Sequence, residues 1–170
     1  MLPLAMPPIH ITSIYCFQDL PKTAVDHIRC ELLALALAVQ LRGLCLLGHE
    51  GLNATVSGED HAISRFKELI GSLFQRADLH FKDSQGAQHP FHAFKVKIKP
   101  EIVTLGRPGL VPKDEASTHL GPTEWRAAMK EPGTVVLDTR NSYEVEIGKF
   151  AGALDLGIEE FRQFPERLAQ

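Results

Sequence analysis

The order of strand-like and helix-like apolar patterns between residues 11 and 84 is the feature that most limits the possible folds. One helical stripe of apolar residues, spaced three or four positions apart, consists of Val25, Ile28, Leu32, Leu35, Ala36 and Val39. A second stripe consists of Ile63, Phe66, Leu69, Ile70 and Leu73. Short apolar runs, three of them rich in aromatic or β-branched residues, predict strands at 11–17, 44–47, 53–57 and 79–82.

The predicted order is therefore strand, helix, strand, strand, helix, strand. This order is typical of an α+β fold, the ferredoxin-like βαββαβ sandwich, in which two helices cover one face of a sheet. We assign residues 9–105 to this domain. It includes a further strand at 94–99, where Phe94, Val96 and Ile98 alternate with Lys95, Lys97 and Lys99.

A stretch rich in Gly and Pro follows and predicts a linker at 106–121. Residues 122–170 then show a short helix that contains Trp125 and one convincing core strand at 135–137. A parallel sheet needs several strands joined by crossovers, each unit about 30 residues long or more. We therefore expect 122–170 to hold only the incomplete start of a second domain.

Charge and cysteine content exclude several classes of protein. The net charge of −3 gives no field strong enough to predict a nucleic-acid or membrane partner by itself. Cys16, Cys30 and Cys45 show no metal-binding spacing, so we expect buried packing thiols, no metal and no cofactor. No apolar run reaches the about 20 residues that cross a bilayer, and prolines interrupt the apolar start. We expect a cytoplasmic protein with reduced thiols.

Three strings lie in one order along the chain. They are Gly-His-Glu-Gly-Leu-Asn-Ala-Thr at 48–55, Phe-His-x-Phe-Lys-Val-Lys-Ile-Lys at 91–99 with Glu-Ile-Val-Thr-Leu-Gly at 101–106, and Asp-Thr-Arg-Asn-Ser-Tyr-Glu-Val-Glu-Ile-Gly at 138–148. Together they resemble the signatures of the rhodanese-related tRNA uridine hydroxylases over residues 11–168. The resemblance implies a ferredoxin-like domain fused to an α/β rhodanese domain. It also implies tRNA as the partner and oxygen-dependent hydroxylation of its wobble uridine.

The same resemblance implies an essential cysteine on a rhodanese loop, where backbone N–H groups lower the pKa of the thiol. The last cysteine of this sequence is Cys45, on a predicted strand, and none lies on such a loop. We therefore assign no catalytic residue and expect the chain to be inactive in this form. Apolar residues of the incomplete segment should stay poorly covered, which favours self-association.

Asp138, Arg140 and Glu144 follow the predicted strand of this segment. They either border the rhodanese pocket or serve the structure. In the structural interpretation, which we favour, Asp138 caps nearby N–H groups and Arg140 pairs with Glu144 or Glu146.

The first domain supplies the candidate RNA contacts. His49, Glu50 and Asn53 lie at or beside a turn flanked by glycines, where they either contact substrate or only hold the hairpin. The row of Lys95, Lys97 and Lys99 either follows an RNA backbone or protects an edge strand from aggregation.

Three functions are open at this stage. The first is tRNA uridine hydroxylation, implied by the resemblance. The second is a non-enzymatic module that binds RNA or another partner through the lysine row. The third is sulfur transfer from thiosulfate, which the rhodanese-like strand suggests.

Overall fold

The computed structural model describes residues 8–107 and 120–170. The chain divides into two compact units, Met1–Val103 and Thr104–Gln170. The predicted linker at 106–121 lies mostly outside the described residues, and the domain limits at 105 and 122 stay predictions. In the described part of the chain, no helix is long and apolar enough to cross a membrane.

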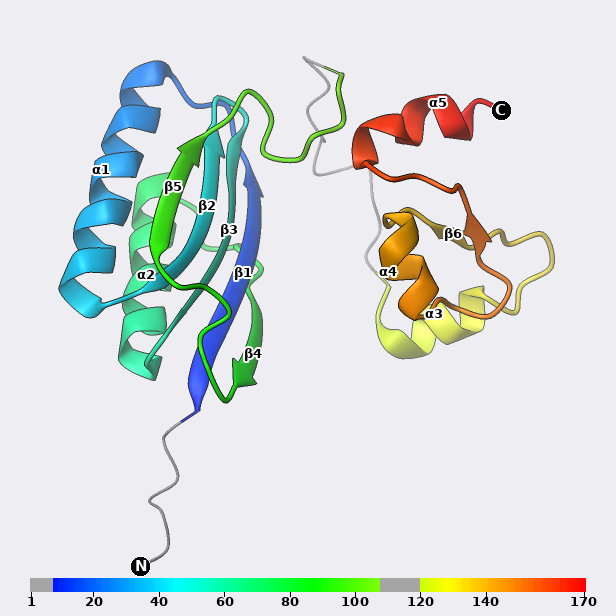
Figure 1. Ribbon diagram of the computed structural model, residues 1–170, viewed down its shortest axis with the longest axis horizontal. Coiled ribbons are helices and arrows are strands. Elements are labelled where there is room, and N and C mark those ends of the chain that lie inside the picture. The colour runs from blue at the N-terminus through cyan, green and yellow to red at the C-terminus, as the bar shows by residue number, and fades with distance from the viewer. Residues whose placement is uncertain (1–7, 108–119) are drawn as a thin grey trace, which may run out of the picture. The chain divides into compact units, whose positions relative to one another are not determined.

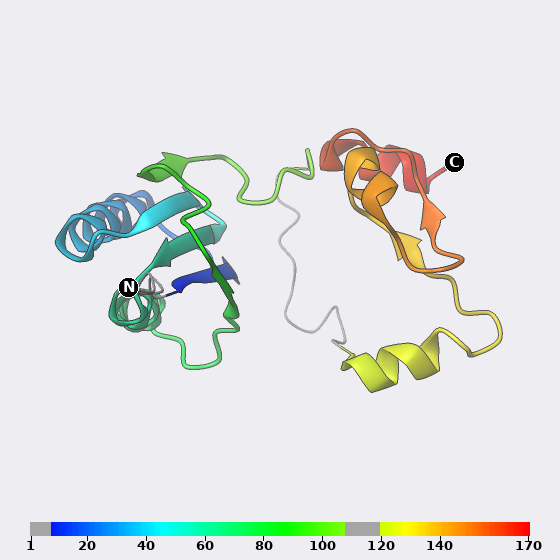
Figure 2. The ribbon, with the colours of Figure 1, turned by 60° about the horizontal axis from the view of Figure 1, so that its bottom comes forward.

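The first unit is a five-stranded sheet covered on one face by two helices (Figures 1 and 2). In sheet order the strands are β4 (Lys82–Gly86), β1 (Ile9–Phe17), β3 (Gly51–Gly58), β2 (Arg42–Gly48) and β5 (Phe94–Ile98). The helices are α1 (Lys22–Val39) and α2 (Asp60–Phe74). All neighbouring strands are antiparallel except β2 and β5, which are parallel. This arrangement confirms the predicted ferredoxin-like α+β fold.

The core lies between the helices and one face of the sheet. Both helices contribute the stripes seen in the sequence, and buried residues include Val25, Ile28, Leu32, Phe66 and Ile70. Every second residue of the strands completes the core, including Ile14, Cys16, Cys45, Leu47, Leu52, Ala54 and Val56. Leu69 and Leu73 are only partly buried, and Ala62 and Phe74 complete the inner face of α2 instead.

The fourth predicted strand, 79–82, is wrong in position. The strand runs over Lys82–Gly86, where Ser13 pairs with Lys82 and Ile9 with Gly86. This edge segment is polar and mostly exposed, so it carries no apolar alternation that the sequence could reveal. Leu79 and Phe81, which suggested the strand, pack against the core from the connection before it.

The second unit is small and has little regular structure. Its elements are α3 (Pro122–Ala128), β6 (Leu137–Asp138), α4 (Ser142–Ile147), β7 (Leu154–Asp155), the 3₁₀ helix η2 (Phe161–Gln163) and α5 (Phe164–Leu168). β6 and β7 pair in parallel over two residues each. The core strand predicted at 135–137 lies instead at Leu137–Asp138, and Val135 is 69% exposed. Val145, Ala153 and Ile158 form its buried apolar residues among those described.

Replacing Phe66 by Ala should lower the free energy of unfolding by about 3–5 kcal/mol, because the ring is fully buried and its loss leaves a cavity. Urea unfolding followed by far-UV circular dichroism, which reports α1 and α2, measures the change. Leu37→Ala on α1 is the matched control: this side chain is 85% exposed, so the loss should stay below about 0.5 kcal/mol. Equal losses in the two variants would contradict the assigned core.

Candidate functional site

The turn between β2 and β3 is held close to the end of β1. The Gly51 φ of 131° lies in a region that favours glycine, and an added Cβ would lie 1.9 Å from the carbonyl oxygen of Cys16. The backbone N–H groups of Gln18 and Leu20 donate to the carbonyls of Glu50 and His49, at 3.0 and 2.7 Å. The turn therefore has one fixed conformation.

The polar side chains of the turn bind backbone groups of neighbouring segments. His49 Nδ1 donates to the carbonyl of Leu20 at 2.9 Å. The carboxylate of Glu50 accepts the N–H of Ile102, and Asn53 Nδ2 donates to the carbonyl of Ile102 at 3.0 Å. The backbone N–H and carbonyl of the buried Ile102 are thus both hydrogen-bonded, as buried backbone groups require. His49, Glu50 and Asn53 hold the hairpin, and their contact with RNA stays a prediction.

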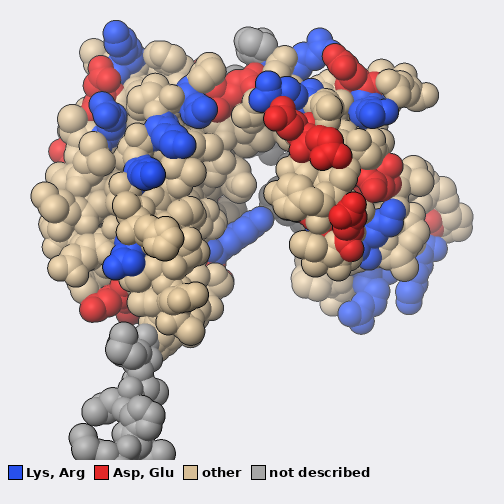
Figure 3. Space-filling model, in the orientation of Figure 1, with Lys and Arg blue, Asp and Glu red and all other residues tan. Residues whose placement is uncertain are grey.

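The lysine row lies on β5, at the edge of the sheet beside β2. Lys95 and Lys97 pair with Leu44 and Leu46, on the face opposite the helices. All three lysines, including Lys99 just beyond the strand, are exposed. Figure 3 shows basic side chains over β5 on a face that is otherwise mostly uncharged. The row is therefore accessible to a polyanion and also suits an edge strand.

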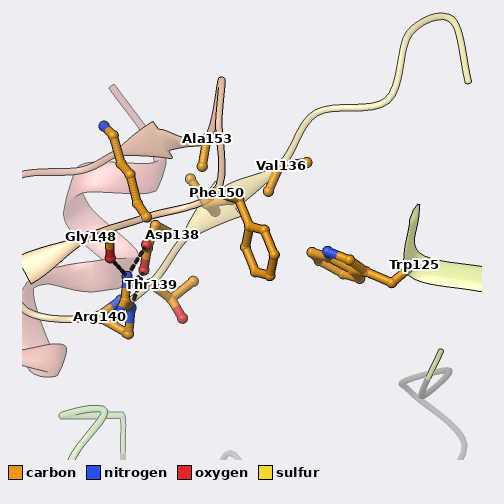
Figure 4. Close-up of a pocket in the computed structure, with 10 residues that line it drawn as sticks. Trp125, Val136, Asp138, Thr139, Arg140, Gly148, Phe150 and Ala153 are labelled. Carbon is orange, nitrogen blue, oxygen red and sulfur yellow. Dashed lines mark hydrogen bonds and ion pairs between the residues drawn. The ribbon is translucent and has the colours of Figure 1, made fainter. Parts of the chain in front are cut away.

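In the second unit, Asp138 and Arg140 form a two-pronged ion pair. Arg140 Nε and Nη2 donate to the two carboxylate oxygens of Asp138 at 2.9 and 2.7 Å, and the Arg140 backbone N–H donates to Oδ1 at 3.2 Å. Nη2 also donates to the carbonyl of Gly148 at 2.7 Å (Figure 4). The hydrogen bonds from Arg140 lower the pKa of Asp138 to about 2, so this carboxylate is ionised at neutral pH.

The predicted pairing of Arg140 with Glu144 or Glu146 is wrong. The Arg140 guanidinium binds Asp138 instead, because Asp138 lies two residues before it and its carboxylate is largely buried. Glu144 instead accepts the backbone N–H of Asn141 at 3.2 Å and completes a capping box at the start of α4. The predicted capping role of Asp138 is confirmed by its bond from the Arg140 N–H.

A cavity of about 590 Å³ lies beside this ion pair. Its walls include Asp138, Arg140 and Lys149, and two aromatic rings, Trp125 and Phe150, face each other 5.6 Å apart (Figure 4). The ion pair and Lys149 make the polar side of the cavity cationic overall. No cysteine lines it, since the last cysteine of the sequence is Cys45.

The three cysteines lie in the first unit. Cys16 and Cys45 are buried on strands as expected, and burial raises the pKa of Cys45 to about 12, so its thiol stays protonated. Cys30 is exposed on α1, and the expectation that it packs in the core is wrong because it points away from the sheet side of the helix. Among the described residues, no cluster of three His, Cys, Asp or Glu side chains could hold a metal ion.

Replacing Asp138 by Asn should destabilise the second unit at neutral pH and much less at low pH. The pKa of Asp138 falls from 3.8 to about 2 on folding, so its contribution is complete above about pH 4 and disappears as the pH falls to about 2. Fluorescence of Trp125, the single tryptophan, follows unfolding of this unit. Glu159→Gln, at an exposed carboxylate, is the control. If wild type were still clearly more stable than Asp138→Asn at pH 2, the assignment of the stabilisation to ionised Asp138 would be contradicted.

Comparison with known proteins places these features in a family. Residues 9–102 match the family model described as the UPF0176 acylphosphatase like domain. The chain is 40% identical to the tRNA uridine(34) hydroxylase of Mesorhizobium japonicum, over 93% of this chain and 50% of that protein. It is 39% identical to the protein of the same name from Brucella anthropi, over 96% of this chain and 53% of that protein.

The protein of the same name from Deinococcus radiodurans is 42% identical over 93% of this chain and 51% of its own length. The chain thus spans about half the length of the curated relatives it matches. The matched region of the family model covers the whole five-stranded sheet and both of its helices. The chain belongs to the UPF0176 family, of which it carries the acylphosphatase-like domain.

Proposed function

We propose that this chain acts in the hydroxylation of uridine 34 of tRNA and supplies a part of the enzyme that binds the tRNA. The observation that carries the proposal is the identity of 39–42% with three proteins named tRNA uridine(34) hydroxylase, over more than nine tenths of this chain. The first unit supports it with an accessible row of lysines on the sheet face opposite the helices.

The chain by itself lacks a reactive thiol for this chemistry. Cys45 stays protonated in the core, Cys16 is buried, and Cys30 lies on a helix rather than on a loop of backbone N–H groups. We therefore propose that the chain binds tRNA without oxidising it. Asp138 and Arg140 would then border the pocket that receives the reactive cysteine, with Arg140 holding the Gly148 carbonyl at its rim.

Two further properties follow as proposals. We place the chain in the cytoplasm, where its tRNA substrate is found. We also propose that the second unit associates with an apolar partner surface, another copy of this chain included. The support is that Ile147, Phe150 and Leu154 are 88%, 55% and 55% exposed, since exposed apolar surface favours association.

A second candidate is a binding module without catalytic action of its own. The lysine row favours it, because exposed lysines at successive outward positions of one strand suit phosphate contacts. Both candidates require tRNA binding, and they differ in whether this chain can complete an active enzyme.

A chimera tests that difference. In the Deinococcus radiodurans relative, the part that this chain matches is replaced by this chain, and tRNA treated with the protein is digested and analysed by mass spectrometry for hydroxylated uridine at position 34. We expect the chimera to form the product and the chain alone to form none.

Two outcomes contradict the proposal. A chimera that folds and binds tRNA but forms no product would leave only the binding module. Product formed by the chain alone would show that a reactive group lies within it.

Replacing Lys95, Lys97 and Lys99 together by Ala should weaken tRNA binding. The slope of log affinity against log salt is negative, and loss of three phosphate contacts should make it less steep by about 2 to 3, because each contact releases close to one counterion. Fluorescence anisotropy of labelled tRNA at several salt concentrations measures the slope.

The matched control replaces Lys22, Arg29 and Arg65 by Ala. These exposed residues lie on the two helices, on the other face of the sheet, and their loss changes the net charge equally. Equal effects of the two triple variants would show that only total charge matters and would remove the lysine row as a site.

A further inference from the structure

Strand pairing arranges the side chains of the uncovered sheet face in rows. One row runs from β1 to β5 and consists of Tyr15, Asn53, Leu46 and Lys97. The next row spans all five strands and consists of Lys82, Ser13, Thr55, Leu44 and Lys95. Side chains in a row lie on neighbouring strands about 4.8 Å apart, so the longer row is about 19 Å wide.

The charged residues at the paired positions of this face are all basic. Paired positions on it include Lys82, Lys95, Lys97 and Arg42, and none is Asp or Glu. The acidic residue of the paired strands, Asp83, pairs with Thr12 and lies on the helix side, where it binds Lys67 at 2.6 Å. A face whose paired positions carry basic and no acidic residues attracts polyanions.

Both ends of the face are covered by connections, which leaves a strip between them. At one end His89 Nδ1 lies 2.9 Å from the hydroxyl of Ser57, which is fully buried. At the other end the segment at Ile102 is held by Glu50 and Asn53. Tyr15 and the longer row lie between these covers, and Asn53 of the shorter row borders the second cover.

The strip contains the exposed aromatic ring of Tyr15, and small side chains lie beside it. Tyr15 is 55% exposed although it lies on β1, a central strand of the sheet. Next to it, Ser13 and Thr55 are small and share one hydrogen bond of 2.9 Å, which leaves the second hydroxyl proton available to water or to a bound base. Leu44 and Leu46 are half-buried. A flat group with polar edges, such as a base, can therefore rest against the Tyr15 ring and pair with the remaining hydroxyl.

We propose that this strip binds unpaired RNA bases, with Tyr15 as the stacking platform and Lys95, Lys97 and Lys82 as phosphate contacts. The proposal deepens the proposed function and rests on tRNA being the partner. Unpaired bases are favoured over a duplex because paired bases already stack on each other and offer no face to a protein ring. The four basic residues of the face, the three lysines and Arg42, favour RNA over an uncharged apolar peptide, because only RNA carries phosphates for them to bind.

The test uses the full chain and an RNA hairpin with the sequence of a tRNA anticodon arm, carrying 2-aminopurine in its loop. Stacking on Tyr15 should quench the 2-aminopurine fluorescence. Tyr15→Ala should abolish this quenching and weaken hairpin binding by about 5-fold to 150-fold, the effect of losing one stacked base. Tyr15→Phe keeps the ring and should retain both. The salt dependence should not change in either variant, since no charge is removed.

Tyr143→Ala is the matched control, because Tyr143 is also well exposed, at 60%, but lies in the second unit. It should leave binding and quenching unchanged. A fully paired duplex of the same RNA should bind wild type and Tyr15→Ala equally. Circular dichroism checks that each variant is folded.

The inference is overturned if folded Tyr15→Ala binds and quenches like wild type, or if wild type binds the duplex as tightly as the hairpin. If the chimera still hydroxylates uridine 34 in that case, only the RNA-binding strip is rejected and the proposed function stands. If Tyr15 controls hairpin binding while the chimera forms no product, the proposed enzyme function falls and the RNA-binding strip remains.

Discussion

The antiparallel pairing of β1 with β3 is the constraint on which the first unit depends. Its register runs without interruption from His10 and Gly58 to Phe17 and Gly51. Because successive side chains in a strand point to opposite faces, a shift by one residue would exchange every inward and outward group. The register sends Ile14 and Cys16 under the helices and Tyr15 to the open face. Gly51 ends it, since no side chain fits beside the Cys16 carbonyl.

The two units differ in how their polar groups are used. In the first, Glu50 and Asn53 bind the backbone of Ile102, while Lys95 and Lys97 are exposed on the open face of the sheet. In the second, Asp138 and Arg140 satisfy each other and fix the Gly148 carbonyl, so their charges shape a cavity wall. A strongly lowered pKa at Asp138 therefore reports a structural ion pair rather than an acid catalyst.

Periodic elements could be predicted from the sequence, and the non-periodic ones could not. The stripes of α1 and α2 and the buried strands repeat at 3.6 or 2 residues, so they are visible locally. β4 is polar, and only its bonds to β1 make it a strand. The partner of Arg140 was missed because Asp138, Glu144 and Glu146 are all within reach in sequence, and burial selects among them. Tyr15 was missed because one aromatic residue in a strand carries no signal.

The amino-acid sequence by itself determined the α+β class, the positions of the two long helices and of four strands of the sheet, the alternation that exposes Lys95 and Lys97, and the absence of a cysteine after Cys45. These depend on local periodicity and composition. Only the tertiary structure decided that Tyr15 shares a face with those lysines, that acidic side chains are absent from the paired positions there, and that Cys30 is exposed. Such facts depend on which strands become neighbours, and that is set by long-range hydrogen bonding and burial.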